Sequence, residues 1–204
     1  MLPNFPCFNR SKDSSLIKTE EVKWDGPFSL PKYNHINHLD VIPDNSGVYI
    51  FTFNYKNGYI VRLVGESNSF KRRMSQHIRE YKKGNYTVLD FKSAQMGVRK
   101  EIWHGWSYAK KNQNQFINNK DYIIEAVEQE LASYRLFIAY ISDKRKSQRL
   151  EFAIMHNIYA STQPWSDLVD RGMFLTGRFN SEVPINIKNQ CQYKLYGVPE
   201  FLEI

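Results

Sequence analysis

The chain has 204 residues, of which 42% are hydrophobic and 15% aromatic, which suits one folded domain with extensions and excludes a disordered chain. Lysine and arginine number 28 against 21 acidic residues, and the net charge of +7 favours a polyanionic partner such as nucleic acid or an acidic membrane surface. The N-terminus lacks the apolar core of a signal peptide, and no apolar run reaches membrane-spanning length. We therefore expect a soluble, cytoplasmic protein.

Residues 1–44 are irregular and hold several prolines, so we expect an extended N-terminal arm that packs partly on the core. The next segment predicts a β-hairpin. Two runs of β-forming residues, Val48–Phe53 and Tyr59–Val64, flank Asn57-Gly58, the strongest short hairpin signal that a sequence offers.

The register of this hairpin decides which side chains share a face. If Asn57-Gly58 is a two-residue loop, Phe53 lies opposite Arg62 and Tyr49 lies opposite Glu66. A face that carries a tyrosine, an arginine and a glutamate is not simply core. A β-bulge would change this register, and Tyr49 would then read equally well as a third core aromatic of its strand.

A capped helix is predicted after the hairpin. A Ser-Asn-Ser cluster precedes a helical stripe that consists of Phe70, Met74, Ile78 and Tyr81. Arg73 and His77 are four residues apart on one flank of this stripe, so both can face one cleft, whereas Arg72 points about 100° away toward solvent or a DNA phosphate. A histidine at such a position can also be an ordinary core residue.

Residues 84–120 form a basic insert rich in asparagine, lysine and aromatic side chains. From Lys82 to Lys120 there are eight basic and two acidic residues. Such a run is either a solvated face or a surface for phosphate contacts and base stacking. The candidate DNA-contacting residues are Arg72, Lys92, Arg99, Lys100, Trp103, Trp106, Lys110 and Lys111.

The second half of the chain predicts a helix over 121–132, a buried strand over 134–141 and a second amphipathic helix over 143–159. Glu151 falls inside the apolar arc of the last helix. An ionised carboxylate there needs a compensating charge, which either a buried ion pair or a metal ion can provide. The remaining residues, 161–204, show no motif.

Gly47–Tyr49 and Leu63–Gly65 together resemble the two tripeptides of the GIY-YIG nuclease family. That family has an arginine eight residues after the second tripeptide, often a histidine or tyrosine four further on, and a glutamate on the helix that follows the central strand. Arg73, His77 and Glu151 stand at these places. The resemblance covers about residues 47–160.

The resemblance implies an α+β fold with a GIY-YIG-like core, in which a small mixed sheet of the β-hairpin and a central strand is flanked by helices. The implied organisation is an N-terminal arm (1–44), a nuclease core with the basic insert (45–162) and a C-terminal extension (163–204).

The resemblance also implies a divalent-metal-dependent endonuclease that hydrolyses double-stranded DNA, sequence-specific as in a restriction system. Tyr49 would orient or deprotonate the water, with His77 accepting its proton. Arg73 would stabilise the transition state, and Glu151 would bind Mg²⁺ or Mn²⁺. The resemblance allows a homodimer and gives no reason to expect membrane binding.

Three further positions complete the expected site. Arg62 stands where some restriction-type members have a lysine, and Asn180 is the candidate for a late asparagine of the family. Leu63 replaces the usual tyrosine, so that hydroxyl is either absent or replaced by Tyr59.

The alternatives to a restriction-type nuclease are a catalytically impaired DNA-binding protein that keeps the fold, a mobile-element, phage or repair nuclease, and a basic protein whose motif match is chance.

Overall fold

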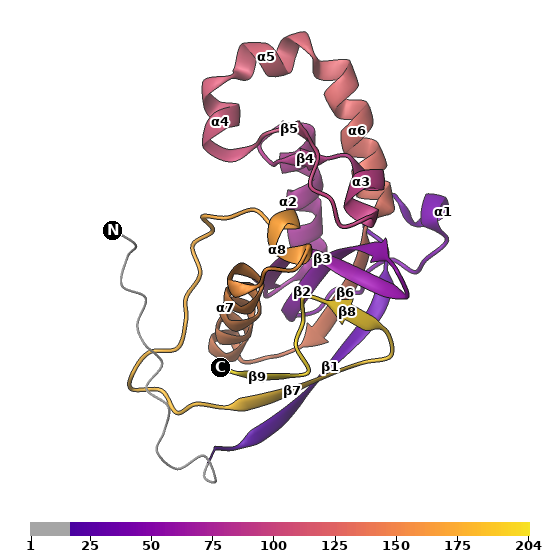
Figure 1. Ribbon diagram of the computed structural model, residues 1–204. Coiled ribbons are helices and arrows are strands. Elements are labelled where there is room, and N and C mark those ends of the chain that lie inside the picture. Colours follow the sequence, from indigo (N-terminus) through magenta and orange to yellow (C-terminus); the bar gives the residue numbers. More distant parts are fainter. Residues whose placement is uncertain (1–16) are drawn as a thin grey trace.

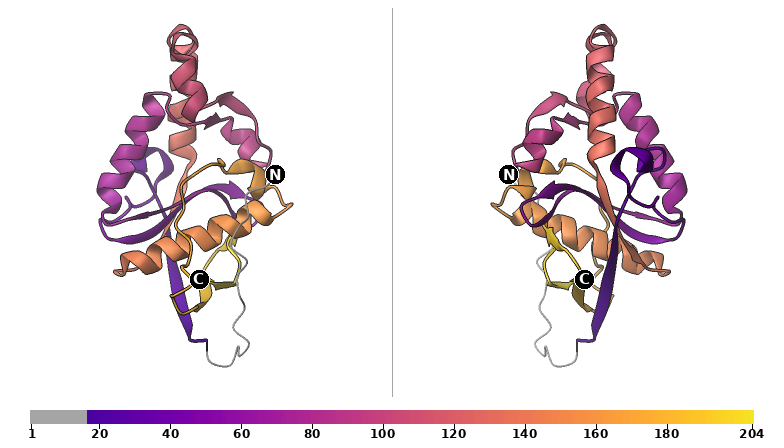
Figure 2. Two further views of the ribbon diagram at one scale, coloured as in Figure 1. Left: turned by 90° about the vertical axis from the view of Figure 1, so that its left-hand side faces the viewer. Right: turned by 90° about the vertical axis from the view of Figure 1, so that its right-hand side faces the viewer.

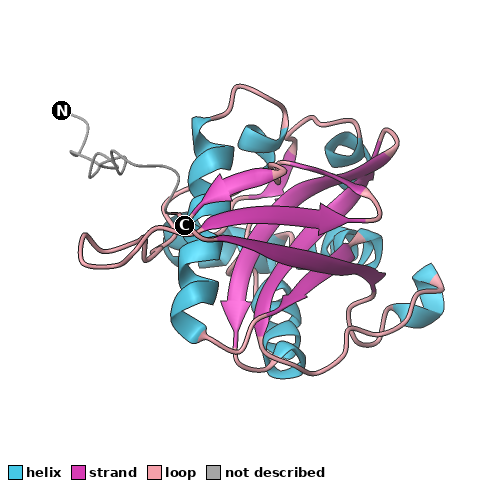
Figure 3. Cartoon of the chain, turned by 90° about the horizontal axis from the view of Figure 1, so that it is seen from below, coloured by secondary structure: helices cyan, strands magenta, loops and turns pink. Residues whose placement is uncertain are grey.

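A computed structural model describes residues 17–204 as an α+β protein built on one mixed, seven-stranded sheet. The sheet curls strongly into a half-barrel, with helices packed on its faces (Figures 1 and 3). The strand order is β8-β3-β2-β6-β1-β7-β9. In chain order the strands are β1 (Thr19–Phe28), β2 (Gly47–Tyr55), β3 (Gly58–Ser67), β6 (Arg135–Tyr140), β7 (Asn186–Cys191), β8 (Lys194–Tyr196) and β9 (Phe201–Glu203).

The predicted hairpin forms as β2 and β3, but its expected register is wrong. The two-residue loop is Lys56-Asn57, with Lys56 at φ +49°, so that Tyr55 pairs with Gly58. A β-bulge between Phe51 and Thr52 then shifts the register by one residue.

Near the turn, Phe53 therefore pairs with Ile60 instead of Arg62. Beyond the bulge, Tyr49 pairs with Gly65 instead of Glu66. The bulge leaves Arg62 as the extra residue of β3, and it turns into the core rather than lying across from a β2 residue.

The predicted buried strand is β6, and it is the central strand of the sheet, antiparallel to both β2 and β1. Alternation along β2 divides the core in two. Tyr49 and Phe51 belong to one apolar cluster, and Val48 and Ile50 belong to the other.

Helices α2 (Phe70–Lys82) and α6 (Lys120–Ser133) pack on the face of Tyr49 and Phe51, while α7 (Lys144–Ala160) covers the face of Val48 and Ile50. Ser69 caps α2 by accepting from the Arg72 amide. Asp143 caps α7 in the same way. The helices expected over 121–132 and 143–159 are confirmed within one or two residues.

The terminal segments belong to the sheet, which is a correction to the expected arm and extension. β1 pairs with β6 on one side and, in parallel, with β7 on the other. β8 extends the hairpin edge beside β3, and β9 extends the other edge beside β7. The sheet is therefore larger than the expected hairpin plus central strand. The start of the expected arm, residues 1–16, lies outside the described residues.

The basic insert folds into short elements between α2 and α6. They are β4 (Val88–Leu89), α3 (Phe91–Gln95), β5 (Glu101–Trp103), α4 (Trp106–Lys111) and α5 (Gln113–Asn118). Figure 1 shows α4, α5 and α6 as an open arch above the sheet, and Figure 2 shows this arch edge-on. Two short helices remain, α1 (Asn34–Asn37) and α8 (Trp165–Leu168). Within residues 17–204, no helix has the length and apolar character needed to cross a membrane.

Candidate active site

Hydrogen bonds join the side chains of Tyr49, Arg73 and His77, which come from β2 and α2, and the charge of Glu151 on α7 acts on Tyr49 and Arg73. These four residues are here called the Tyr49 cluster. The Tyr49 hydroxyl lies 2.8 Å from His77 Nε2, and Arg73 Nε donates a hydrogen bond of 2.9 Å to the same oxygen. Because Arg73 can only donate, the Tyr49 proton is free to point at His77 Nε2. The phenol is thus held between a cation and a base.

Gly65 makes this arrangement sterically possible. A Cβ atom on Gly65 would lie 2.2 Å from the Tyr49 hydroxyl oxygen, so the phenol crosses β3 where that strand has no side chain. Because the Tyr49 ring occupies this space, the second tripeptide has to have a glycine at position 65.

Burial sets the protonation of the two central groups. Tyr49 and His77 are both almost completely buried. Burial raises the pKa of Tyr49 above its ordinary value, although the charge of Arg73 opposes this shift. Burial, followed by the charge of Arg73, lowers the pKa of His77 to about 3. At neutral pH the pair is therefore a neutral phenol beside a neutral imidazole, and within the described residues His77 Nδ1 has no hydrogen-bond partner.

Glu151 approaches the same group from α7. Burial and the negative charge of Glu66 raise the pKa of Glu151 to about 7, whereas Arg73 and the Glu66 backbone lower it. The charge of Glu151 also acts on both Tyr49 and Arg73. Two carboxylates and one arginine therefore share the rim of the cluster, and the negative charge there is incompletely compensated.

Arg72 and Arg73 point in the different directions that helical geometry predicts. Arg73 is half-buried and donates to Tyr49 and, through Nη1, to Gln76. Arg72 is exposed, and its guanidinium donates to Asn68 on the helix N-terminal side.

Arg62 does not supply a cation to the Tyr49 cluster, which corrects the expectation. It is buried in a second group, the Arg62 cluster, which consists of Arg62, Glu130, Tyr134 and Asp170. Its guanidinium donates to the Thr87 and Leu168 carbonyls. The bulge that displaced the register turned this residue inward.

Two other expected residues lie apart from the cluster. Tyr59 sits at the turn end of the hairpin, where it packs on Phe137 and Tyr193, so it cannot replace the hydroxyl that Leu63 lacks. Asn180 is exposed, and no hydrogen bond joins it to the Tyr49 cluster within residues 17–204.

Tyr86 is a neighbour of the cluster that sequence reasoning missed. Its half-buried ring lies 5.6 Å from that of His77, and its pKa is raised by burial and lowered in part by Arg73. Tyr86 follows α2 at the start of the insert, where no motif marks it. Only the chain reversal at Gly84, where φ is +72°, brings it back onto the helix.

The expected DNA-contacting residues divide into exposed and buried ones. Arg72 and the lysines at 92, 100, 110 and 111 are exposed. Trp103 is only 4% exposed and donates its indole N–H to the Gly84 carbonyl, so it cannot stack on a base, which corrects that prediction. Trp106 is 40% exposed.

Arg99 is already engaged within the protein. Its guanidinium donates to Glu101, to Asp170 and to the backbone carbonyls of residues 167–169. It therefore ties the insert to the segment after α8 rather than presenting a free cation.

No protein-family model, curated protein or solved structure matches this chain, so a function has to be inferred from the geometry of the cluster itself.

Proposed function

We propose that the protein is a GIY-YIG-type endodeoxyribonuclease that hydrolyses phosphodiester bonds of double-stranded DNA with the help of a divalent cation. One observation carries this proposal. The Tyr49 hydroxyl is shared between Arg73 Nε and His77 Nε2, crosses the strand at Gly65, and lies within the electrostatic influence of Glu151. The hydrogen bonds among Tyr49, Arg73 and His77, and the electrostatic influence of Glu151 on Tyr49 and Arg73, support this proposal.

The chemistry assigned to each residue follows from its surroundings. Arg73 is the half-exposed cation, so it meets the scissile phosphate and stabilises the charge that develops on its oxygens. As Arg73 turns toward the phosphate, the buried Tyr49 hydroxyl becomes accessible and orients the attacking water. As the water attacks, its proton goes to the Tyr49 oxygen while the Tyr49 proton moves to His77 Nε2, at which the hydroxyl already points. Leu63 stands where the family usually has a tyrosine, and the Tyr86 hydroxyl takes the place of the hydroxyl that is missing there.

The residues at the rim fit a hydrated divalent cation. Burial keeps the pKa of Glu151 near 7 beside a second carboxylate, Glu66, and a bound cation would relieve that repulsion. No group of three or more His, Cys, Asp or Glu side chains suited to a metal occurs in the described part of the chain. A site with Glu151 as its main protein ligand is compatible with Mg²⁺ or Mn²⁺, because such a cation keeps several water ligands. Such a cation would polarise the phosphate and stabilise the leaving oxygen.

The setting that we propose is a sequence-specific enzyme of the restriction type. The exposed lysines of the insert and the arch α4–α6 give the protein its own DNA-binding surface. Contacts between the lysines and DNA phosphates would supply affinity, while the amide side chains of α5 would contact base edges.

The proposal is tested by incubating the purified protein with phage DNA in MgCl₂, with EDTA as the control. Phage DNA offers many sequences, so discrete fragments are expected if the enzyme is sequence-specific. Glu151→Gln keeps the shape and removes the ligand charge, so cleavage should be lost while folding and DNA binding persist. Glu125→Gln makes the same chemical change at an exposed position of α6 and should cleave normally. Cleavage by Glu151→Gln at the wild-type rate would refute the metal assignment.

The role of Tyr86 is tested separately. Tyr86→Phe removes only the hydroxyl and keeps the ring contacts with His77 and Trp106. We expect single-turnover cleavage to slow about 10- to 100-fold, since one hydrogen bond to a charged group is worth about 1.5–3 kcal/mol. An unchanged rate would show that the Tyr86 hydroxyl takes no part in catalysis.

A second candidate, a DNA-binding protein that does not cleave, is favoured by one observation. The Tyr49 side chain is completely covered, and Leu63 brings no hydroxyl to replace it. This candidate predicts DNA binding that is unaffected by EDTA and by Glu151→Gln, without cleavage of any substrate in Mg²⁺ or Mn²⁺.

A further inference from the structure

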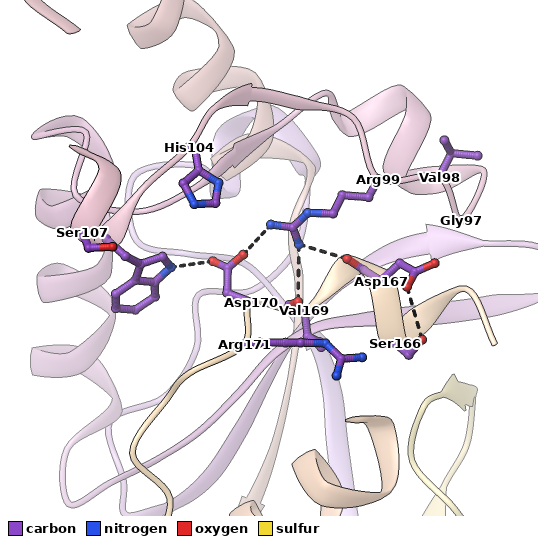
Figure 4. Close-up of a pocket in the computed structure, with 11 residues that line it drawn as sticks. Gly97, Val98, Arg99, His104, Ser107, Ser166, Asp167, Val169, Asp170 and Arg171 are labelled. Atoms are coloured by element: carbon purple, nitrogen blue, oxygen red, sulfur yellow. Dashed lines mark hydrogen bonds and ion pairs between the residues drawn. The ribbon is translucent and has the colours of Figure 1, made fainter. Parts of the chain in front are cut away.

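A hollow of about 770 Å³ lies beside the Arg62 cluster, whose Asp170 lines it, between the insert and the residues of α8 and the segment that follows. Figure 4 shows the side chains of His104 and Ser107 on one side of it and those of Asp167 and Arg171 on the other. Its size is within the range of small-ligand pockets, so it can accept a flat heterocyclic ring.

Trp106 forms one wall of this hollow and is held there under strain. Its backbone is left-handed at φ +58°, which a bulky side chain rarely adopts and which often marks a functional position. The indole N–H donates to Asp170 Oδ2 over 3.0 Å, and the ring packs on Tyr86 with centroids 5.0 Å apart and planes 31° apart. Since the side chain is still 40% exposed, Tyr86 covers only part of it and aromatic surface remains free.

The polar groups of the hollow suit a nucleobase better than a phosphate. Asp170 is held charged: burial raises its pKa, but Arg62, Arg99 and Trp106 together lower it to about 2. Asp167 adds a second carboxylate, which would repel an anion. Arg171 is exposed and forms no ion pair with any described residue, and Ser107 adds a hydroxyl. Donors and acceptors beside an aromatic face match the edge and the plane of a base.

Tyr86 connects the hollow with the candidate catalytic residue His77. The rings of His77, Tyr86 and Trp106 follow one another at centroid distances of 5.6 and 5.0 Å, so a base on Trp106 would continue this series. We propose that the hollow binds one nucleobase, unstacked from the DNA near the scissile phosphate, against the exposed surface of Trp106. This proposal rests on the proposed function, because it assumes that DNA is bound at the Tyr49 cluster.

The test compares the affinity of the full-length protein for a short oligothymidylate and for an abasic deoxyribose-phosphate strand of equal length, in EDTA to prevent cleavage. The two probes carry the same backbone charge, so their difference isolates the contribution of the bases. We expect the wild type to prefer oligothymidylate about tenfold and its tryptophan fluorescence to be quenched on binding. Trp106→Leu should lose the preference and the quenching while its affinity for the abasic strand is unchanged.

Two further variants keep the test decisive. Ser107→Leu puts a bulky, non-aromatic side chain into the hollow and should also lose the preference. Phe201→Leu, which removes an exposed aromatic side chain of β9 that does not line the hollow, should keep it. A preference that survives in Trp106→Leu, or no preference in the wild type, overturns the proposal. Parallel cleavage assays separate the two hypotheses. If the protein cleaves phage DNA but shows no base preference, only the proposal that the hollow binds a nucleobase is refuted. If it shows the base preference but does not cleave DNA, only the proposal that it is a nuclease is refuted.

Discussion

The Tyr49 cluster and the Arg62 cluster contain the same residue types, an arginine, a tyrosine and a glutamate, yet their charges are arranged in opposite ways. In the Arg62 cluster every charge faces another protein group. Glu130 accepts from the Leu89 amide and the Tyr134 hydroxyl, and Asp170 binds two arginines. In the Tyr49 cluster the arginine is half-exposed and the glutamate lacks a direct ion pair within the described residues.

Under the proposed function, the comparison means that residue type alone does not distinguish a structural cluster from a catalytic one. A buried arginine surrounded by acceptors stabilises the fold only as long as its partners remain, because removing one of them leaves an uncompensated charge. An arginine at the rim of a buried phenol has free donors for a ligand. The difference lies in exposure, because Arg62 is enclosed by protein groups whereas Arg73 is half-exposed, and the variants below test it.

The largest effects are expected when the two arginines are truncated. Arg73→Ala should reduce single-turnover cleavage at saturating enzyme on the order of a hundredfold or more, because a donor to the transition state is removed, with little change in stability. Arg62→Ala should destabilise the fold by about 3–5 kcal/mol, because Glu130 and Asp170 then lose a buried partner. Urea unfolding and single-turnover rates measure both, and the reverse pattern would contradict the assignment of the two clusters.

The arginines also show how far the sequence could predict the site. The positions of Arg73 and Arg72 follow from helical periodicity, because Ser69 caps α2 and fixes where the helix begins. The position of Arg62 depends on a bulge in the hairpin, and local residue preferences do not specify that bulge. The part of the site that lies on one regular helix was therefore predictable, and the part that depends on strand register was not.

Contacts between distant segments set a second limit on prediction. β1 and β7 pair in parallel, and the Trp24 indole donates to Asn189, a residue 165 positions away in the chain. No periodicity within either strand encodes so distant a partner, so the terminal segments were expected as an arm and an extension. Tyr86 likewise reaches the Tyr49 cluster only through the tertiary fold of the insert.

The next effect in size concerns Gly65. Gly65→Ala would place a Cβ atom 2.2 Å from the Tyr49 hydroxyl oxygen, so the phenol must move away from Arg73 and His77. We expect cleavage to fall at least tenfold and stability to fall by about 1–3 kcal/mol from overpacking. Gly172→Ala is the control, since a Cβ there meets no atom within 4 Å and its cost is limited to backbone strain at φ +85°. Wild-type cleavage by Gly65→Ala would show that the position of the phenol is not needed.

A smaller effect is expected on stability when Glu151 and Glu130 are each replaced by glutamine. It is measured at different pH values, with and without a divalent metal ion. Burial raises the pKa of both Glu151 and Glu130 to about 7. A carboxyl whose pKa is raised on folding stabilises the protein at low pH, and that contribution disappears as the pH rises through 7. In EDTA, Glu151→Gln should therefore match the wild type at pH 5 and exceed its unfolding free energy at pH 8 by about 1–3 kcal/mol.

The metal then distinguishes the two positions. Mg²⁺ should stabilise the wild type and Glu130→Gln at pH 8, because a cation that binds only the folded state shifts the unfolding equilibrium. It should leave Glu151→Gln unchanged. Thermal unfolding with MgCl₂ and with EDTA measures this difference, and equal stabilisation of all three proteins would place the cation elsewhere.

The smallest effect is expected at Arg72, next to the most sensitive position in the chain. Arg72 is exposed and its guanidinium donates to Asn68 rather than to Tyr49 or His77. A side chain that touches only a DNA phosphate contributes affinity, which saturating enzyme restores. Arg72→Ala should therefore keep its single-turnover rate within about threefold of the wild type, while the slope of DNA affinity against salt concentration falls by about 0.9 log unit for each phosphate that is no longer neutralised. Because Arg72 and Arg73 share one helix turn, any general disturbance of α2 would affect both variants alike. Equal single-turnover losses would then mean that α2 as a whole, rather than the Arg73 guanidinium, supports cleavage.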